Sequence, residues 1–302
     1  MSWFEAVRGA ADSAASTLAD RGWPISLGGP DESDAPIKVP QPARSEFLEN
    51  RAQGDWAEGL LAQAIRAMGL SVTQYGATED IQSDEVGFGD FYRTQIRELR
   101  ALGKRPDLLV GHAGCAMPPS VSGLPATERD AWVQRCVASV EVRSSRYKAL
   151  HYIDAKRQRK AQGVKSVGQM APNFTVKIED LVILYRWIER HRLPQAYAQV
   201  FFDSVFGLNV LRIFELIAAW PAGLKLEKPQ KSQGKPTIFI PITYGEQIGE
   251  MVQPPTFAAG VKETPLGQLN AYVIPRGGKL RLERERLMRV LLGEVGDQRV
   301  ER

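Results

Sequence analysis

Apolar residues recur at every third or fourth position in several stretches of the chain, which predicts amphipathic helices. These stretches cover residues 2–20, 45–68, 91–102, 177–191 and 281–292. Gly69 and Gly103 directly follow two of them, at the position where a glycine commonly ends a helix. Residues 28–42, between the first two helices, are rich in glycine, proline and acids and are therefore expected to form a loop.

Short apolar runs bounded by turn residues predict strands. They lie at residues 71–75, 105–111, 137–142, 196–202, 237–243 and 268–274. The basic, polar segment 225–235 is expected to be a loop. Because strands alternate with helices, we expect an α/β or mixed α+β fold with a central mixed sheet flanked by helices. We divide the chain into an N-terminal helix and loop (1–44), a core (45–220) and a C-terminal region of strands and a helix (221–302).

The composition is that of an ordinary globular protein. Of the 302 residues, 43% are hydrophobic and 25% are charged, and no apolar run is long enough to cross a membrane. We therefore expect a cytoplasmic protein. The two cysteines, Cys115 and Cys136, form no CxxC pair, and there are only three histidines. This scarcity argues against a disulfide framework and against a zinc site built from cysteine and histidine.

The net charge is only +4, but basic residues are concentrated in one segment. Between positions 143 and 165 the single acid is Asp154, and the bases are Arg143, Arg146, Lys148, Lys156, Arg157, Arg159, Lys160 and Lys165. Such a cluster suits contacts with nucleic-acid phosphates, although a solvent-exposed helix face or loop shows the same pattern. The candidate DNA contacts are Arg146, Lys148, Lys156, Arg157, Arg159, Lys160 and Lys177.

Two acids stand in otherwise apolar runs that we expect to form neighbouring strands. Asp107 follows Pro106, and 34 residues later comes the triplet Glu141-Val142-Arg143. A carboxylate in a buried strand is costly unless it is ion-paired or binds a cation. Strand alternation puts Glu141 and Arg143 on one face of the sheet. Both carboxylates, the carbonyl of Val142 and water molecules form a ligand set that suits Mg²⁺.

This layout is that of the PD-(D/E)xK nuclease sites. The motif is short, and Asp107 as a turn residue with Glu141 in a structural ion pair would give the same pattern. Glu58 falls near the apolar stripe of the helix predicted at 45–68, and it is a further candidate metal ligand and catalytic residue; Glu49 is a weaker one. Gln199 is a candidate to position the metal ligands through hydrogen bonds without binding the metal itself. Alternatively, its side-chain amide forms hydrogen bonds only with the backbone.

Four segments together are similar to the AccI-like family of type II restriction endonucleases, within the PD-(D/E)xK nuclease superfamily. They are GKRPDLLV at 103–110, SVEVRSS at 139–145, FTVKIEDL at 174–181 and AQVFFD at 198–203. The resemblance implies a restriction-endonuclease-like fold, Mg²⁺ dependence, and cleavage of a short duplex DNA sequence that leaves 5′-phosphate ends. By motif position it also implies that Asp107 and Glu141 are the metal ligands.

One departure from the superfamily pattern concerns position 143, where a lysine is expected and this chain has Arg143. Arginine does not lose its proton near neutral pH, so it cannot act as a general base. It can still stabilise negative charge that develops on phosphorus. Lys148 and Lys177 are the candidates to supply the missing ammonium group.

The sequence thus predicts a type II restriction endonuclease with Asp107, Glu141, Arg143, Glu58 and Lys148 as catalytic residues. The expected partners are double-stranded DNA and a second copy of the chain, because the recognition sites of this class are usually symmetric. A cognate methyltransferase is expected in the same system, but not as a stable subunit. Two alternatives stay open: a repair or RNA nuclease that uses the same site, and a non-catalytic DNA-binding module.

Overall fold

The structure is a computed structural model that describes residues 2–28, 37, 45–76, 87–164, 171–227, 235–264 and 267–294. Its helices are α1 (Trp3–Asp20), α2 (Ser45–Ala67), α3 (Phe88–Leu102), α4 (Ala126–Val133), α5 (Ala149–Ala161), α6 (Ile178–His191), α7 (Val210–Ala219) and α8 (Arg284–Leu292), with a short 3₁₀ turn η1 (Ile242–Tyr244). Its strands are β1 (Ser71–Gln74), β2 (Leu108–Gly111), β3 (Cys136–Ser144), β4 (Asn173–Lys177), β5 (Gln195–Val200), β6 (Ser204–Asn209), β7 (Lys225–Glu227), β8 (Thr237–Pro241), β9 (Glu246–Gln253), β10 (Thr256–Glu263), β11 (Leu269–Arg276) and β12 (Lys279–Leu282).

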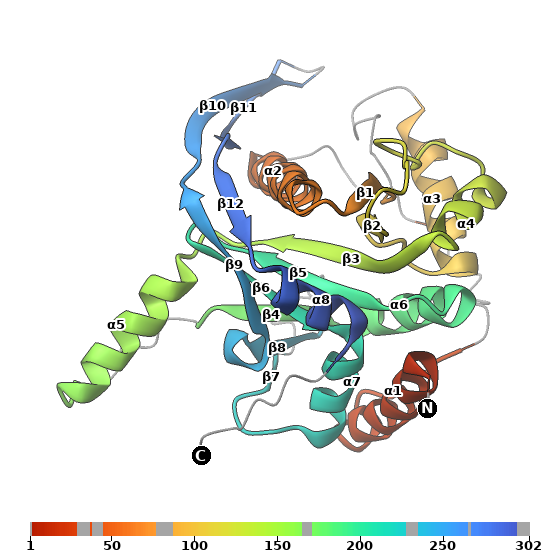
Figure 1. Cartoon of the computed structure of the whole chain (residues 1–302), viewed down its shortest axis with the longest axis horizontal. Coiled ribbons are helices and arrows are strands. Elements are labelled where there is room, and N and C mark those ends of the chain that lie inside the picture. The colour runs from red at the N-terminus through yellow and green to blue at the C-terminus, as the bar shows by residue number, and fades with distance from the viewer. Residues whose placement is uncertain are drawn as a thin grey trace.

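A seven-stranded sheet runs through the middle of the molecule in the order β1-β2-β3-β5-β6-β9-β12 (Figure 1). Strands β3 and β5 are parallel, whereas the other neighbouring pairs are antiparallel, so the sheet is mixed. A three-stranded sheet, β4-β8-β7, and the two-stranded hairpin β10-β11 complete the β structure of the described residues. The central mixed sheet predicted from the sequence is therefore confirmed.

Helices cover both faces of the central sheet (Figure 1). Helices α1, α6 and α7 pack on one face, where they share a core with Tyr197 of β5 and Phe206 of β6. Helices α2 and α8 cover the other face, where Val140, Val142 and Ala198 are buried. Because side chains alternate along a strand, the residue of β3 between those valines points to the face covered by α6. This alternation turns Glu141 toward α6.

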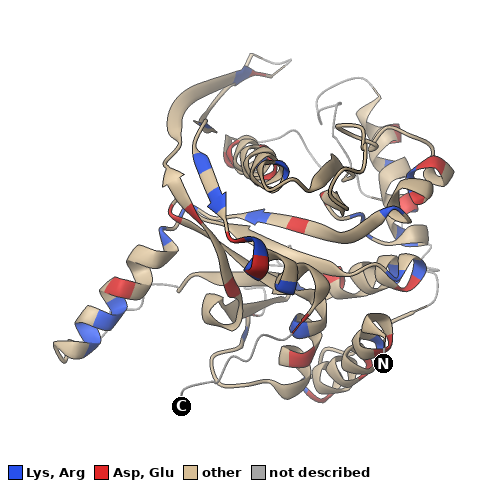
Figure 2. Ribbon diagram, viewed as in Figure 1, with Lys and Arg blue, Asp and Glu red and all other residues tan. Residues whose placement is uncertain are grey.

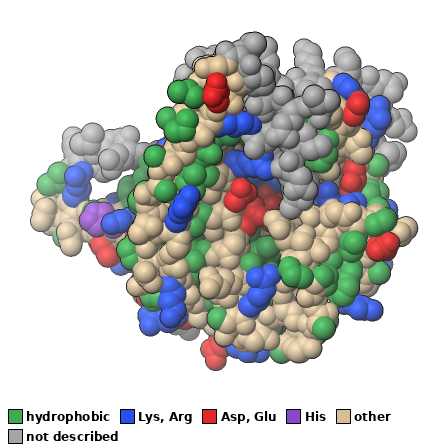
Figure 3. Space-filling view, turned by 90° about the horizontal axis from the view of Figure 1, so that it is seen from above, with side chains coloured by type: hydrophobic (Ala, Val, Ile, Leu, Met, Phe, Trp, Pro, Cys, Tyr) green, Lys and Arg blue, Asp and Glu red, His purple; other side chains and the backbone are tan. Residues whose placement is uncertain are grey.

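The hairpin β10-β11 projects from the sheet beside α2 (Figure 1). One face lies toward α2, where Asn270 is buried and accepts a hydrogen bond from Ser45 Oγ. The opposite face exposes large hydrophobic side chains: Phe257, Val261, Leu269 and Val273. Figure 3 looks down on this side of the molecule and shows hydrophobic side chains along the hairpin, with acidic and basic side chains gathered near the centre of the face.

Most of the predicted helices and strands are present within a few residues of their expected bounds. Two predicted segments are partly wrong. The expected loop at 225–235 begins with β7, because Leu226 pairs with Ile238 of β8 and packs against the core. The helix expected at 281–292 begins only at Arg284, because residues 281 and 282 pair with β9 as the end of β12.

Other expectations concern the ends of the chain and the basic segment. Within the basic segment, Ala149–Ala161 forms α5, a helix that projects from the body of the molecule (Figures 1 and 2). Apart from residues 28 and 37, the loop expected at 28–42 lies outside the described residues, as does Lys165.

Strands β9 and β12 extend the central sheet from the C-terminal region, while the three-part division of the chain stays a prediction. None of the described helices is long and apolar enough to span a bilayer.

A single glycine fixes the approach of α3 to α6. Gly103 ends α3 with φ 87° and ψ 178°, a conformation that is essentially restricted to glycine. A methyl group there would overlap the backbone of Ile183 and Trp187 in α6. We expect Gly103→Ala to lower the free energy of unfolding by about 2–5 kcal/mol, from backbone strain and overpacking together.

The matched control is Gly69→Ala. Gly69 also follows a helix and has φ 81°, but a methyl group added at this position would meet no neighbouring atom within 4 Å. It should lose only about 1 kcal/mol, since the strain of a positive φ is its single cost. Urea unfolding of both variants measures the difference. Equal losses would contradict the close packing of Gly103 on α6.

Candidate active site

Backbone hydrogen bonds fix the segment that joins α3 to β2. The amide of Lys104 donates to the carbonyl of Ile183 in α6 at 2.9 Å, and the carbonyl of Asp107 accepts from the amide of Tyr75 at 2.9 Å. The Asp107 carboxylate accepts a hydrogen bond from the amide of Val142 at 2.6 Å through Oδ2. Asp107 is therefore held between the end of β1 and the middle of β3.

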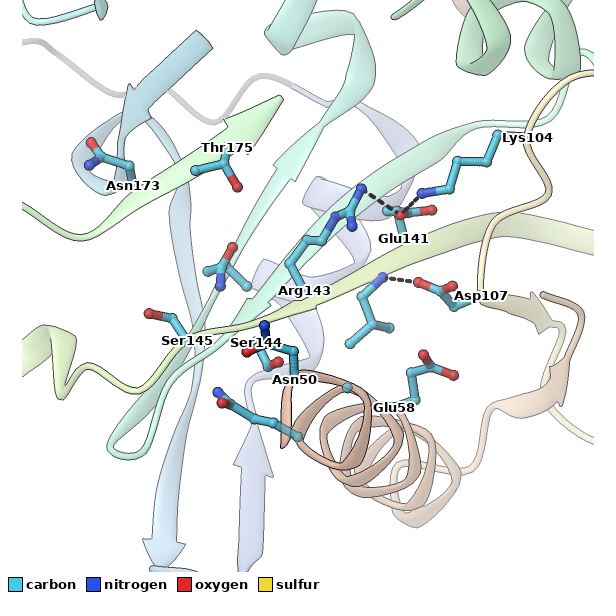
Figure 4. Close-up of a pocket in the computed structure, with 14 residues that line it drawn as sticks. Asn50, Glu58, Lys104, Asp107, Glu141, Arg143, Ser144, Ser145, Asn173 and Thr175 are labelled. Carbon is cyan, nitrogen blue, oxygen red and sulfur yellow. Dashed lines mark hydrogen bonds and ion pairs between the residues drawn. The ribbon is translucent and has the colours of Figure 1, made fainter. Parts of the chain in front are cut away.

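Glu141 lies in β3 and is only 1% exposed. Its Oε1 contacts two cations, the ammonium of Lys104 and, at 3.0 Å, the guanidinium of Arg143 (Figure 4). Its buried Oε2 has no hydrogen-bond partner among the described residues. Burial raises the pKa of Glu141, but Lys104 and Arg143 together outweigh burial and leave this pKa below its usual range. Glu141 is thus an ionised carboxylate with one free oxygen.

Arg143 is fixed by contacts on several sides. Besides Glu141, its guanidinium lies 3.5 Å from Oδ2 of Asp180 at the start of α6 and 5.9 Å from the ring of Tyr197. The charge of Glu141 raises the pKa of Arg143 further above its already high value. Arg143 is therefore a permanent cation with a set position beside the carboxylate.

Glu58 reaches the same region from α2 (Figure 4). Burial, with the charges of Asp55 and Glu141, raises the pKa of Glu58 to about 7. Burial, with the charges of Glu141 and Glu58, also raises the pKa of Asp107 well above its usual range. Of the three carboxylates Glu58, Asp107 and Glu141, only Glu141 is in direct contact with Lys104 and Arg143, so Glu58 and Asp107 leave a surplus of negative charge that favours a bound proton or metal cation.

These acidic and basic side chains line a common cavity of about 490 Å³. The residues predicted from the sequence that line it are Glu58, Asp107, Glu141, Val142, Arg143 and Gln199. Asn50 and Gln53 of α2 and Asn173 and Thr175 of β4 complete a polar wall (Figure 4). Two carboxylates that lie 34 positions apart in the sequence thus share one cavity with a third from a helix.

No group of three or more histidine, cysteine, aspartate or glutamate side chains among the described residues lies close enough to hold a metal ion. Lys104 and Arg143 contact Oε1 of Glu141, and the Val142 amide donates to Oδ2 of Asp107. The chemistry of the donors nevertheless fits Mg²⁺, which prefers oxygen ligands. The unpartnered Oε2 of Glu141 and the surplus charge on Asp107 and Glu58 are features that a divalent cation would satisfy.

The comparison with known families agrees with this arrangement of residues. The sequence model of the family described as AccI restriction endonuclease matches residues 2–171 and 163–296 of the chain. The chain belongs to the AccI restriction endonuclease family. Membership makes it a type II restriction endonuclease, a site-specific deoxyribonuclease of the hydrolase class, as the sequence predicted. No curated protein and no solved structure matches the chain.

In this AccI-family enzyme some of the predicted residues lie outside the cavity. Lys148 precedes α5 and does not line it, and Lys177, at the end of β4, lines a neighbouring cavity instead. Arg146 pairs with Glu49 of α2 at 3.1 Å. The remaining candidate DNA contacts, Lys156, Arg157, Arg159 and Lys160, are exposed on α5.

The sequence reasoning missed Lys104 and Asp180, although both stand in segments that carry the resemblance to the AccI family. The position of Lys104 follows from the pairing of β2 with β3, which the structure supplies. The antiparallel register pairs Leu108 with Val140, and continued by one residue it puts Asp107 opposite Glu141. Of the two basic residues shortly before Asp107, Lys104 contacts Glu141, whereas Arg105 pairs with Glu98. For Asp180 we find no signal in the sequence, because its contact depends on how α6 packs.

The raised pKa of Glu58 predicts a pH-dependent stability. A carboxyl whose pKa rises from 4.5 in the unfolded chain to about 7 in the folded protein costs stability as the pH increases through this range. In the absence of metal, Glu58→Gln should therefore raise the free energy of unfolding by about 1–3 kcal/mol at alkaline pH. At pH below about 4.5, where both states are protonated, the gain should vanish.

Urea unfolding in EDTA at several pH values measures this gain. Glu46→Gln on the same helix is the control, because Glu46 is exposed and its replacement should change stability little at any pH. A Glu58→Gln gain that stays constant across the pH range would contradict the raised pKa of Glu58.

Proposed function

We propose that this enzyme uses Mg²⁺ to hydrolyse phosphodiester bonds at a specific sequence of double-stranded DNA, leaving 5′-phosphate and 3′-hydroxyl ends. The observation that carries the proposal is the shared cavity, in which three carboxylates lie beside Lys104 and Arg143. Family membership supports DNA as the substrate. The site chemistry is that of phosphoryl transfer, in which positioning and charge stabilisation supply most of the catalysis.

We assign the Mg²⁺ ligands to Asp107, Glu141 and the carbonyl of Val142, with Glu58 binding directly or through water. When bound, the cation would polarise the attacking water and offset the charge of the phosphate. Glu141 offers its free Oε2, while Asp107 is oriented by the amide of Val142. Gln199, which is 3% exposed and paired in register with Arg143, supports the site from β5.

Lys104 takes the place of the lysine that the PD-(D/E)xK pattern expects at position 143. Its ammonium contacts the same carboxylate oxygen of Glu141 that Arg143 contacts, so it reaches the position from the preceding loop. There it orients the attacking water beside Glu141. Arg143, held by Glu141 and Asp180, stabilises the negative charge that builds up on the phosphate oxygens.

The remaining assignments concern DNA binding and assembly. Helix α5, with its exposed cations, and Arg146 and Lys148 before it are proposed to contact DNA phosphates (Figure 2). The enzyme is proposed to act as a homodimer on a symmetric site, alongside a separate methyltransferase. Residues 221–302 are assigned to DNA recognition or dimerisation, and the exposed hydrophobic face of the hairpin β10-β11 favours dimerisation.

Cleavage of phage DNA in the presence of Mg²⁺ tests the activity. The wild-type enzyme should give discrete fragments whose sequenced ends share one site and carry 5′-phosphates. Asp107→Asn, which keeps an acceptor for the Val142 amide, should abolish cutting and retain binding to duplex DNA in Ca²⁺. Cutting by this variant would contradict the site, and cleavage confined to single-stranded DNA or RNA would contradict the function.

The two lysine assignments differ in what they predict for turnover. Lys104→Met removes the ammonium from Glu141, so we expect kcat to fall by about 10²–10³-fold. Lys148→Met serves as the comparison, since Lys148 lies outside the cavity and a phosphate contact there should affect binding more than turnover. Single-turnover cleavage at saturating DNA measures both. If Lys148→Met lowered kcat more than Lys104→Met, Lys148 would instead be the residue that supplies the catalytic ammonium.

A further inference from the structure

A second cavity, of about 740 Å³, adjoins the active site, and Lys104 and Arg143 line both. It lies between α3, α6, the end of β4 and the segment 24–28 that follows α1. Whereas the first cavity is lined by three carboxylates, the second is predominantly basic. The basic side chains that line it are Arg100, Lys104, Arg143, Lys177, Arg186 and Lys235.

The two acids of the second cavity are already neutralised. Glu179 contacts the ammonium of Lys235, and Asp180 lies 3.5 Å from the guanidinium of Arg143. Lys177 is exposed at the end of β4, and no acid of the described residues is within ion-pair distance of it. The cavity therefore keeps a positive charge in a concave, partly buried setting, where attraction for an anion is stronger than on an open surface.

The position of the second cavity beside the active site indicates which anion its positive charge would bind. Lys104 and Arg143 form the boundary between the acidic and the basic cavity, so an anion bound beside the carboxylates and their metal borders the second cavity directly. Successive phosphates of one DNA strand advance only about 3.4 Å along the helix axis. A strand whose scissile phosphate lies in the first cavity thus brings its next phosphates to the second.

We propose that the basic cavity binds the phosphates of the cleaved strand next to the scissile phosphate, with Lys177 and Lys235 as its outer contacts. The proposal rests on the proposed DNA-cleaving function and adds the path of the strand across the protein. Isoleucine, leucine and valine side chains of α3 and α6 line the same cavity, and they offer apolar surface to the sugars. Contacts of this kind position DNA without reading its sequence.

Salt dependence of DNA binding tests the proposal. In an Asp107→Asn background with Ca²⁺, the added changes Lys177→Gln and Lys235→Gln should weaken binding roughly equally for all duplex sequences. The slope of log K against log salt should become shallower by about 2, one for each lost phosphate contact. The matched control carries Arg8→Gln and Arg212→Gln, exposed cations of α1 and α7 that do not line the cavity, and it should keep the slope much closer to that of the parent.

Neutral methylphosphonates placed one at a time beside the cleavage position locate the contact. A substitution that weakens binding to the parent protein should have little further effect on the lysine double variant. Titration with inorganic phosphate distinguishes a free anion from a DNA strand. Phosphate binding that the two lysine changes abolish, with DNA binding unaffected, would overturn the proposal.

The outcomes separate this inference from the function on which it rests. If the parent protein binds no duplex DNA, the proposed function fails and the inference falls with it. If the parent binds DNA with a steep salt dependence and the lysine double variant behaves like the control, only the basic cavity is wrong.

Discussion

A single buried carboxylate sets the electrostatics of this enzyme. Glu141 stands in the middle of the central sheet, where an unpaired charge would cost several kcal/mol. Two cations from different parts of the chain compensate it, Arg143 from the same strand and Lys104 from the loop before β2. The loop is itself held to α6 by the amide of Lys104, and α6 contributes Asp180 to Arg143. The ion cluster therefore joins the sheet, the loop and the helix that together form the site.

The same arrangement leaves the neighbouring acids unsatisfied. Neither cation makes a direct ion pair with Asp107 or Glu58, and the pKa values of both are raised by burial and by the nearby carboxylates. Natural proteins accept such unfavourable charge where function requires it, because a bound cation or substrate relieves it. At the proposed Mg²⁺ site, the stability that the fold loses here would contribute to the binding of the cation.

The sequence was most informative where local pattern decides structure. Helical periodicity located α1, α2, α3 and α6, and apolar runs located the strands that bring Asp107 and Glu141 to one cavity. It was least informative where a contact depends on packing between distant segments. Lys104 lies in a loop whose path follows from the left-handed Gly103 and its fit against α6, and no periodicity encodes that fit. Strands β7 and β12 were missed because their pairing with β8 and β9 outweighs short polar sequences.

Acidic side chains are concentrated in the first cavity and basic side chains in the second, and Lys104 lines both. This position indicates a role for Lys104 that the sequence motif alone does not predict. Arg143 keeps a cation at the lysine position of the pattern, but its guanidinium also reaches from β3 toward Asp180. Arg143 alone would therefore leave the acidic cavity without an ammonium group. Lys104 reaches Glu141 from the loop before β2, and Lys104 and Arg143 together form the border at which the acidic cavity meets the basic one. In the proposed complex, a phosphate at this border would have carboxylates for a metal on one side and cations for its neighbouring phosphates on the other. The proposed role of Lys104 would make an arginine at position 143 compatible with activity, because an ammonium group reaches Glu141 from the loop before β2.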